Sequence, residues 1–341
     1  MQAIASTITD LVGQTPVLKL QSLSALTGCD ILVKCEFTNP GGSIKDRAAL
    51  SMVQQAIARG DLKPGMTIVE GTAGNTGIGL AIVAKAFGCQ MKVVMPKGQT
   101  PEKENMIALH GAELELVDAV PFKDQRHFYH TARRIAEENP QHYWWANQFE
   151  NLDNSLAHYQ HTGPEIFKQT EGRLDAFVSV AGTGGTIGGC SKYLKEILPE
   201  IKVVLADPQG SGLYEYFKTG TFSSTGSSIT EGIGIMRLVA NFAQAKVDHA
   251  LKIPDQDLVT VSRYVRQHDS LVLGSSSALN VAAALRTAIN MGPGHRILTF
   301  ACDGGERSYS KLYQPTFLAS KELNPDLDIT DLVESYRHAE F

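Results

Sequence analysis

Short apolar runs alternate with helical patterns along most of the chain, and this alternation restricts the fold more than any other feature. Apolar runs of strand length occupy residues 66–70, 89–96, 113–117, 142–147, 176–181, 202–207 and 296–302. Helical patterns occupy residues 46–60, 80–88, 100–111, 122–138, 155–172, 190–198, 259–269 and 278–291. Strands that alternate with helices of roughly 10–15 residues are typical of βαβ units and parallel sheets. The sequence therefore predicts an α/β fold.

The composition limits the classes of protein to which the chain can belong. Its 341 residues allow about two domains, and 43% hydrophobic with 20% charged residues is typical of globular proteins. A net charge of −5 argues against nucleic acid as the main partner, because phosphate binding draws on clustered lysine and arginine. No apolar run approaches the ~20 residues of a membrane span, so no membrane partner is expected. Residues 1–16 contain one acid and no basic region, which predicts no secretory signal and a cytoplasmic location.

The cysteines and histidines do not form a recognisable metal site. The five cysteines include no CxxC pair, which argues against both a disulfide framework and a zinc ribbon. Two histidine pairs have i,i+3 spacing, His127 with His130 and His158 with His161, but no HExxH motif accompanies them. We therefore expect solvated helix faces at these histidines and no metal.

The glycine-rich turn GTGGTIGG (182–189) lies where a strand becomes a helix. Successive backbone N–H groups at a helix N-terminus bind anions, and Thr183 and Thr186 add hydroxyl donors. The turn lacks the lysine of a Walker A loop, and Ile187 stands at the third glycine of a dinucleotide fingerprint. Asp207 does end the next strand, where a ribose-binding acid would lie, so an NAD site stays open. The turn predicts a phosphate site, with a purely structural use of its glycines as the alternative.

A second such turn, EGTAGNTGIG (70–79), offers N–H groups and neutral hydroxyl or amide donors that suit a carboxylate or a phosphate. An ordinary capped turn is the alternative. The segment GSSS (274–277) precedes a third helix, and its serines are either N-caps or ligands. Lys45 follows the turn NPGGS and begins a helical run. An amine beside a phosphate site is the combination that holds pyridoxal phosphate as a Schiff base.

The motifs resemble those of the pyridoxal-phosphate-dependent cysteine synthases (O-acetylserine sulfhydrylases) and cystathionine β-synthases, the fold-type-II group. The similarity covers about residues 8–313. It rests on motifs in the family's order: GQTPVLKL (13–20), NPGGSIKDR (39–47), GNTGIGLA (74–81), NQFEN (147–151), TGPEI (162–166), GTGGT (182–186), EGIG (231–234), GSSSA (274–278) and DGGER (303–307). The resemblance implies two open, twisted, mainly parallel sheets flanked by helices, an active site in the cleft between two domains, bound pyridoxal phosphate, and a homodimer.

The resemblance also implies a role for each matching residue. Lys45 is implied to carry the cofactor as a Schiff base and to take the α-proton of the substrate. Asn75 is implied to bond the ring hydroxyl of the cofactor, and Ser276 to face its ring nitrogen. The other residues are implied to form a phosphate loop (Gly182, Thr183, Gly184, Gly185 and Thr186), a substrate-carboxylate shell (Thr72, Ala73, Gly74, Thr76 and Gln148) and the opposite cleft wall (Gly232).

The activity that the resemblance implies is cysteine synthesis from O-acetyl-L-serine and sulfide, through α-aminoacrylate. A serine opposite the ring nitrogen makes the ring a weaker electron sink than an aspartate would, which favours α,β-elimination over transamination. Two alternatives stay within the family: a cysteine desulfhydrase, which releases sulfide, pyruvate and ammonia, and an enzyme like cystathionine β-synthase. Two alternatives lie outside the family: an NAD-binding oxidoreductase and a non-catalytic binding module. The intact Lys45 argues against the non-catalytic module.

Four positions depart from the usual family pattern. Ala73 replaces a serine, Glu231 a glutamine, Asn147 a glutamine and Ala278 a glycine. Ala73 is shared with a subgroup that contains both cysteine synthases and desulfhydrases. A carboxylate at position 231 is expected to repel an acidic second substrate or to bind an amino group. These departures leave the leaving group and the nucleophile open, and they do not touch Lys45 or the phosphate loop.

We predict a smaller, mobile domain over residues 46–150. The larger domain is expected to combine residues 1–45 with 151–320, and residues 321–341 are expected to form a peripheral tail. Substrate in the 72–76 turn is expected to draw the smaller domain shut and exclude water.

Overall fold

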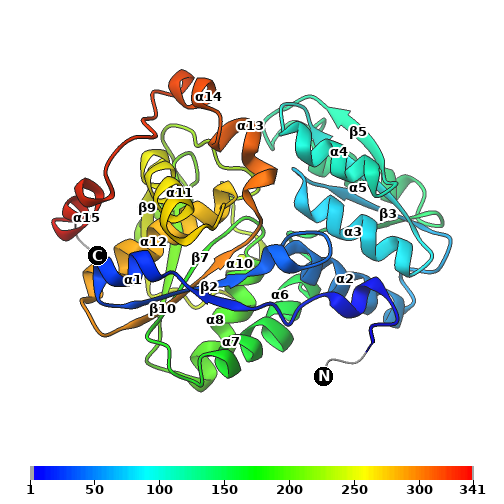
Figure 1. Cartoon of the computed structure of the whole chain (residues 1–341). Coiled ribbons are helices and arrows are strands. Elements are labelled where there is room, and N and C mark those ends of the chain that lie inside the picture. Colours follow the sequence, from blue (N-terminus) through cyan, green and yellow to red (C-terminus); the bar gives the residue numbers. More distant parts are fainter. Residues whose placement is uncertain (1–3, 340–341) are drawn as a thin grey trace.

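Two separate β-sheets organise the structure, which is a computed structural model that describes residues 4–339 (Figure 1). The larger sheet has the strand order β1 (Val17–Lys19), β2 (Asp30–Cys35), β10 (Arg296–Ala301), β7 (Ala176–Val180), β8 (Lys202–Pro208) and β9 (His249–Ile253). Its strands are parallel except that β1 runs antiparallel to β2. The smaller sheet is fully parallel and has the order β5 (Glu113–Val117), β4 (Gln90–Pro96), β3 (Thr67–Gly71) and β6 (Tyr143–Trp145).

Helices flank the two sheets. The smaller sheet packs with α2 (Lys45–Arg59), α3 (Asn75–Ala86), α4 (Pro101–Leu109) and α5 (Phe128–Glu138). Around the larger sheet lie α1 (Gln21–Thr27), α6 (Asp153–Ala157), η3 (His158–Thr162), α7 (Gly163–Gln169), α8 (Gly185–Ile197), α9 (Leu213–Thr219), α10 (Ala240–Ala243), α11 (Asp255–Asp269), α12 (Ser275–Met291) and α15 (Ile329–Arg337). The short helices are η1 (Ile8–Leu11), η2 (Glu36–Thr38), η4 (Gly305–Ser308), α13 (Tyr309–Leu312) and α14 (Pro315–Ser320). The prediction of two mainly parallel sheets flanked by helices is confirmed.

Each sheet has its own hydrophobic core. The central strand β7 of the larger sheet is buried at every position, and the alanine-rich face of α12 packs against β7 and β10. In the smaller sheet, Ile68 of β3 packs toward α2 and α3, whereas Val69 packs with Ala132 of α5 on the other face. Successive strand residues point to opposite faces, so β3 contributes to two cores at once. In Figure 1 the two sheets lie side by side, with α2 near their junction.

The turns that matter for function follow the carboxyl ends of parallel strands. The 72–74 turn follows β3 and begins α3, and the 181–184 turn follows β7 and begins α8. Cys302 and Asp303 follow β10. Ligands of open parallel sheets bind at this end of the strands, where the connections leave the sheet. The fold therefore brings the three segments together in one region, at the carboxyl ends of these strands.

Several predicted boundaries are wrong for local reasons. The helix predicted over 122–138 begins only at Phe128 (α5), and the single helix predicted over 155–172 is α6, η3 and α7, with a π-helical turn at η3. The helix predicted from residue 190 begins at Gly185, because glycines that read as a turn form its first turn. Serines 275–277 are likewise already helical.

Two segments have more structure than the sequence predicts. Residues 208–234, where the sequence predicts neither a helix nor a strand, contain α9, and the tail contains α15, whose Tyr336 is buried and donates to Asp257 of α11 at 2.6 Å. Residues 1–3 and 340–341, which belong to the predicted N-terminal stretch and tail, lie outside the described residues. No helix within residues 4–339 combines the length and the apolar composition of a membrane-spanning helix.

Candidate active site

A cavity of about 220 Å³ lies where the turns from the two sheets meet. Its walls come from the turn after β3, the turn after β7, the 231–235 segment, and the starts of α2 and α12. The cavity is lined by every predicted site residue except Gly185: Lys45, Thr72, Ala73, Gly74, Asn75, Thr76, Gln148, Gly182, Thr183, Gly184, Thr186, Gly232 and Ser276. The structure thus brings together residues that are up to 231 positions apart in the chain, and the individual roles stay predictions.

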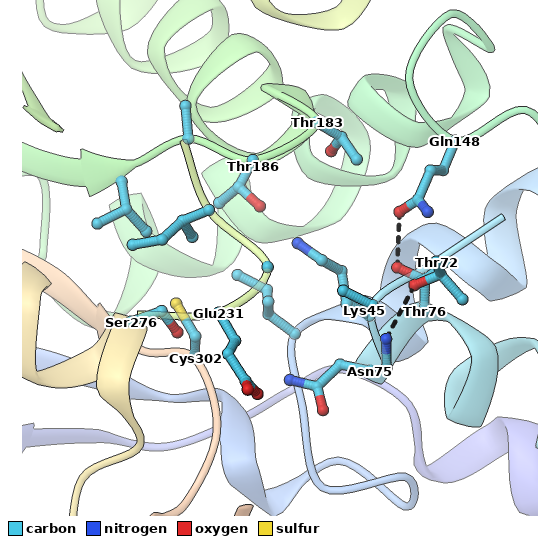
Figure 2. Close-up of a pocket in the computed structure, with 18 of the residues that line it drawn as sticks. Lys45, Thr72, Asn75, Thr76, Gln148, Thr183, Thr186, Glu231, Ser276 and Cys302 are labelled. Atoms are coloured by element: carbon cyan, nitrogen blue, oxygen red, sulfur yellow. Dashed lines mark hydrogen bonds between the residues drawn. The ribbon is translucent and has the colours of Figure 1, made fainter. Parts of the chain in front are cut away.

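Lys45 projects into the middle of this cavity from the first turn of α2 (Figure 2). The loops around it shield its amine, and no described residue forms a hydrogen bond or ion pair with Nζ. Burial lowers the pKa of Lys45, and the nearby Cys302 and Asp303 oppose this shift only in part. Lowering the pKa increases the fraction of neutral amine, which is the form that attacks carbonyl carbons and accepts protons.

The turn after β7 offers donors at the N-terminus of α8. The first N–H groups of a helix have no acceptor within the helix, and here Thr183 and Thr186 place hydroxyls in the same cavity wall. The glycines let this turn pack closely: a Cβ at Gly182 would lie 2.2 Å from the Gly232 carbonyl oxygen. A Cβ at Gly185 would lie 2.0 Å from Asn154 Oδ1. The glycines therefore allow close packing and also leave the N–H donors of the turn open to the cavity. From the sequence alone, these two uses are alternatives.

Buried polar residues support this turn from behind. Asn154 donates to the Thr183 hydroxyl at 3.0 Å and to the Gln148 carbonyl at 2.8 Å, so one amide links the turn after β7 to the segment after β6. His158 is fully buried, and its ring contacts the Thr186 hydroxyl at 3.3 Å. Burial holds the pKa of His158 well below its ordinary value, so the ring is neutral at pH 7. The solvated helix face predicted for His158 is therefore wrong.

The turn after β3 carries the predicted carboxylate shell. Thr72 accepts a hydrogen bond from the Gly74 N–H at 3.2 Å, and Thr76 donates its hydroxyl to Gln148 Oε1 at 2.7 Å (Figure 2). Ala73 lines the cavity without adding a polar group. Asn147, which precedes Gln148, has a positive φ of 51° and so lies in the left-handed region that asparagine tolerates better than glutamine. This conformation accounts for the asparagine at that departure from the family pattern.

Asn75 connects the two sheets. Its Nδ2 donates to Asp303 Oδ2 at 2.7 Å, and its Oδ1 accepts from Arg307 at 2.9 Å. Asn75 begins α3 beside the smaller sheet, whereas Asp303 follows β10 of the larger sheet. One Nδ2 hydrogen is left for a ligand in the cavity.

Ser276 and Cys302 lie together on the cavity wall opposite the carboxylate shell (Figure 2). Burial raises the pKa of the Cys302 thiol to about 12, helped by the Asp303 carboxylate, so the thiol is protonated. Asn280 donates to Cys302 Sγ at 3.3 Å. The thiol beside Ser276 is thus neutral, which suits the predicted role of Ser276 opposite an unprotonated ring nitrogen.

Glu231 lies at the cavity wall and is fully paired. Its two carboxylate oxygens accept from Lys103 of α4 and from Lys311 of α13, each at 2.5 Å. Burial acts to raise the pKa of Glu231, but the two ammonium groups outweigh it and hold the pKa below its ordinary value. The expectation of a free carboxylate in the cleft is therefore wrong: two lysines and one glutamate leave a net positive charge.

Pyridoxal phosphate fits these residues. The unpartnered Lys45 amine would hold its aldehyde carbon, the α8 N-terminus with Thr183 and Thr186 would hold its phosphate, and Asn75 and Ser276 would face its ring polar groups. Asp207, the candidate ribose-binding acid of the NAD alternative, instead forms an ion pair with Lys252 at 2.9 Å and accepts the N–H of Tyr214. The donor set thus favours a carbonyl-bearing phosphate over a dinucleotide.

Sequence reasoning missed the supporting residues of the site. Lys103 and Cys302 line the cavity, whereas Glu70, Asn154 and His158 lie behind it. Only Glu70 carries a sequence signal, an acid that ends an otherwise apolar strand. The others read as ordinary helix or strand-end residues, and only the tertiary structure brings them to the site.

Comparisons with known proteins agree with this geometry. The family model "Pyridoxal-phosphate dependent enzyme" matches residues 8–303. Cysteine synthase 2 of Schizosaccharomyces pombe is 44% identical, with 97% of this chain and 90% of that protein covered. The crystal structure of cysteine synthase (OASS) from Entamoeba histolytica has a TM-score of 0.86 and 31% identity, covering 100% of this chain and 97% of that one.

A second solved structure is of an enzyme that is named for a different activity. The O-acetylserine-dependent cystathionine β-synthase of Helicobacter pylori has a TM-score of 0.83 and 31% identity, covering 92% of this chain and all of that one. The family match, the identity and the shared fold lead to one conclusion. The chain belongs to the pyridoxal-phosphate-dependent enzymes of the cysteine synthase and cystathionine β-synthase family.

Proposed function

We propose that the chain is a cysteine synthase, which converts O-acetyl-L-serine and sulfide into L-cysteine and acetate. In this reaction the bond from Cβ to the acetate oxygen breaks, and a bond from Cβ to sulfur forms. Pyridoxal phosphate, when bound, supplies the electron sink for the negative charge that develops at the substrate α-carbon. The observation that carries the proposal is the unpartnered Lys45 amine, held in a cavity between two turns rich in donors.

Lys45 is the proposed general base. Its Nζ takes the α-proton of the substrate and returns it to the α-carbon once sulfur has added. The lowered pKa of Lys45 supports this role, because a base works best when its pKa lies near the operating pH.

The substrate α-carboxylate is proposed to bind at the 72–76 turn, where the N-terminus of α3 favours negative charge. Lys103 strengthens this preference: its side chain packs on Gly74, where a Cβ would lie 2.4 Å from Lys103 Cδ. The ion pair of Lys103 with Glu231 crosses from α4 to the 231–235 segment over the same cavity. This contact would exclude water while the carbanionic charge exists.

A second candidate is β-replacement by a thiol larger than sulfide, as the name of the Helicobacter pylori protein indicates for that enzyme. The observation that favours it is a neighbouring cavity of about 210 Å³ that shares Phe128, Phe149 and Ile235 with the first. Arg237 closes this second cavity, with its guanidinium 4.6 Å from the Phe122 ring centre. A thiol with an apolar chain would have room there.

One experiment separates these reactions. The purified protein, saturated with pyridoxal phosphate, is incubated with O-acetyl-L-serine and either sulfide or homocysteine, and separately with L-cysteine alone. We expect L-cysteine and acetate in equal amounts from the sulfide reaction. Cystathionine formed faster than cysteine would favour the second candidate, and pyruvate with ammonia from L-cysteine alone would identify a desulfhydrase.

We further propose that the protein acts as a homodimer in the cytoplasm, with the predicted smaller domain at residues 46–150. Large apolar side chains are exposed along the N-terminal segment at Ile8, Leu11 and Leu18, which supports an interface there. Light scattering of the purified protein tests the dimer, and fractionation of cells tests the location.

A further inference from the structure

The carboxamide of Gln148 has no free donor in the cavity. Its Nε2 donates one hydrogen to Glu70 Oε1 at 3.1 Å and the other to the Gly71 carbonyl at 3.1 Å. Its Oε1 accepts the Thr76 hydroxyl at 2.7 Å (Figure 2). When Glu70 is ionised, the opposite orientation would set the carboxamide oxygen against two acceptors, Glu70 and the Gly71 carbonyl, so the network then selects the observed one.

This arrangement does not suit a substrate carboxylate. A carboxylate that reached Gln148 would meet its Oε1, and the Thr76 hydroxyl has already given its hydrogen to the same oxygen. Gln148 Oε1 and the Thr76 hydroxyl oxygen would then both face the negative charge with their lone pairs, which is unfavourable in a cavity shielded from water. Binding through Gln148 therefore requires the carboxamide to turn and to give up Glu70.

Only the side chain of Gln148 is free to turn. Its carbonyl oxygen accepts from Asn154 at 2.8 Å and from Asn241 at 3.0 Å, and both asparagines are buried. The backbone is therefore fixed by the same amide that supports the phosphate loop. The carboxamide has two sets of partners within reach of a side-chain rotation: Glu70 behind it, or a carboxylate in front of it.

Glu70 is the residue that decides between these two sets. Its side chain is fully buried at the end of β3, and the partners of its carboxyl are neutral: Gln148 and nearby backbone N–H groups. On β4, the residue paired with Glu70 is Val93. The neighbouring residue at the end of β6 is Trp145, and the neighbouring residue of α3 is Thr76. From α5 the titratable group that faces it is Tyr129, whose own pKa is raised mainly by burial and in part by Glu70.

The protonation state of Glu70 changes how firmly it holds Gln148. Burial raises the pKa of Glu70 to about 8, although the hydrogen bonds from Gln148 oppose the shift. A buried carboxylate that loses a donor is left with an uncompensated charge, whereas a protonated carboxyl loses much less. Release of Gln148 is therefore easier below pH 8 than above it.

We propose that Glu70 is a positioning residue for the amino-acid substrate, which holds the Gln148 carboxamide in a resting orientation and releases it to the substrate α-carboxylate. This inference rests on the proposed function, because it takes the 72–76 turn as the carboxylate site. Glu70 itself does not line the cavity. It acts through Gln148 and Thr76, and its effect is on substrate affinity.

The test compares wild type with Glu70→Gln in the holoenzyme, by calorimetric titration with L-alanine between pH 6.5 and 9.5. L-Alanine has the α-amino and α-carboxylate groups of the substrate but no leaving group. Glu70→Gln keeps an acceptor for Gln148 and removes the titration. We expect the ratio of wild-type to variant dissociation constants to be constant below pH 7 and to rise about tenfold by pH 9, since only wild type must protonate Glu70 to release Gln148.

Isopropylamine, in which a methyl group replaces the carboxylate of L-alanine, is the matched ligand. Its ratio of dissociation constants is expected to stay flat across the same pH range. An equal rise of the ratio with pH for both ligands would overturn the inference, because Glu70 would then affect the whole site and not the carboxylate contact alone. A flat ratio for L-alanine would also overturn it while leaving the proposed function intact. A wild type that binds L-alanine no more tightly than isopropylamine would overturn the carboxylate site itself.

A second variant keeps the inference testable if Glu70→Gln does not fold. Gln148→Ala removes the carboxamide that Glu70 is proposed to hold, and it leaves Glu70 buried. The dissociation constant of this variant for L-alanine is expected to lack the rise near pH 8 that wild type shows. A step of wild-type size in Gln148→Ala would show that the pH dependence arises elsewhere and would overturn the proposal.

Discussion

Asn75 and Asp303 are joined by a hydrogen bond of 2.7 Å, although one begins a helix beside the smaller sheet and the other follows the last strand of the larger sheet. Arg307 donates to the other side of the same Asn75 amide at 2.9 Å. The residue implied to face the ring hydroxyl of the cofactor is thus also a link between the two sheets. Loss of this bond would disturb the site and the contact between the two sheets together.

Asn75→Asp is expected to lower kcat/KM at least tenfold. The new carboxylate would keep the bond to Arg307 but would face Asp303 Oδ2 at the distance of a hydrogen bond, with no hydrogen between the oxygens. Adding Asp303→Asn restores a donor and is expected to recover most of the loss. Steady-state kinetics of the two single variants and the double variant measure the coupling, which we expect to be about 1–3 kcal/mol. Additive losses would refute a direct contact.

Glu231→Gln is expected to destabilise the protein by about 3 kcal/mol at pH 7, because it leaves two lysines without their buried anionic partner. The pKa of Glu231 lies below its ordinary value of 4.5 when the protein is folded. Its stabilising contribution is therefore fully present above the unfolded pKa and is lost as the pH falls through the folded pKa.

The measurement for Glu231 is the difference in thermal midpoint between wild type and variant from pH 7 down to pH 3. We expect a difference that holds to about pH 5 and then shrinks in acid. Glu138→Gln changes an exposed acid of α5 and is the control, with no midpoint shift expected. A difference in thermal midpoint that does not change with pH would mean that the charge of the Glu231 carboxylate contributes nothing to stability.

Ala73→Ser restores the hydroxyl that the usual family loop carries at the cavity wall. One added hydrogen bond to the substrate carboxylate is worth about 0.5–1.5 kcal/mol, so we expect KM for O-acetyl-L-serine to fall about twofold to tenfold. Cofactor content, measured by absorbance after denaturation, is expected to stay unchanged. The same KM in both proteins would place the position outside the substrate contacts.

Much of the fold follows from the sequence because its signals are local. Apolar runs that end at glycine-rich turns locate β3 and β7, and the carboxyl-end rule for parallel strands places the turns after them at one site. Lys45 stands out for a similar reason, since a turn of proline and glycines fixes where α2 begins. These features need no knowledge of distant contacts.

The errors occur where distant contacts decide. Gly185 opens α8 rather than a turn because the helix packs against Asn154, which its sequence neighbours do not reveal. His158 reads as a surface residue, yet it lies in a π-helical turn and is buried against Thr186 of the predicted phosphate loop. Glu231 reads as a free acid, and only the tertiary structure supplies Lys103 and Lys311. Partners of buried polar groups are set by the whole fold and not by spacing.

Lys45 is proposed to be the amine that holds pyridoxal phosphate and acts on the substrate. The most direct measurement is reduction of the holoenzyme with borohydride, followed by proteolysis and mass analysis of the lysine peptides. We expect the mass of the reduced cofactor on the peptide that contains Lys45, and its absence from a folded Lys45→Ala protein that makes no L-cysteine. Cofactor on a different lysine, or full activity of Lys45→Ala, would contradict it.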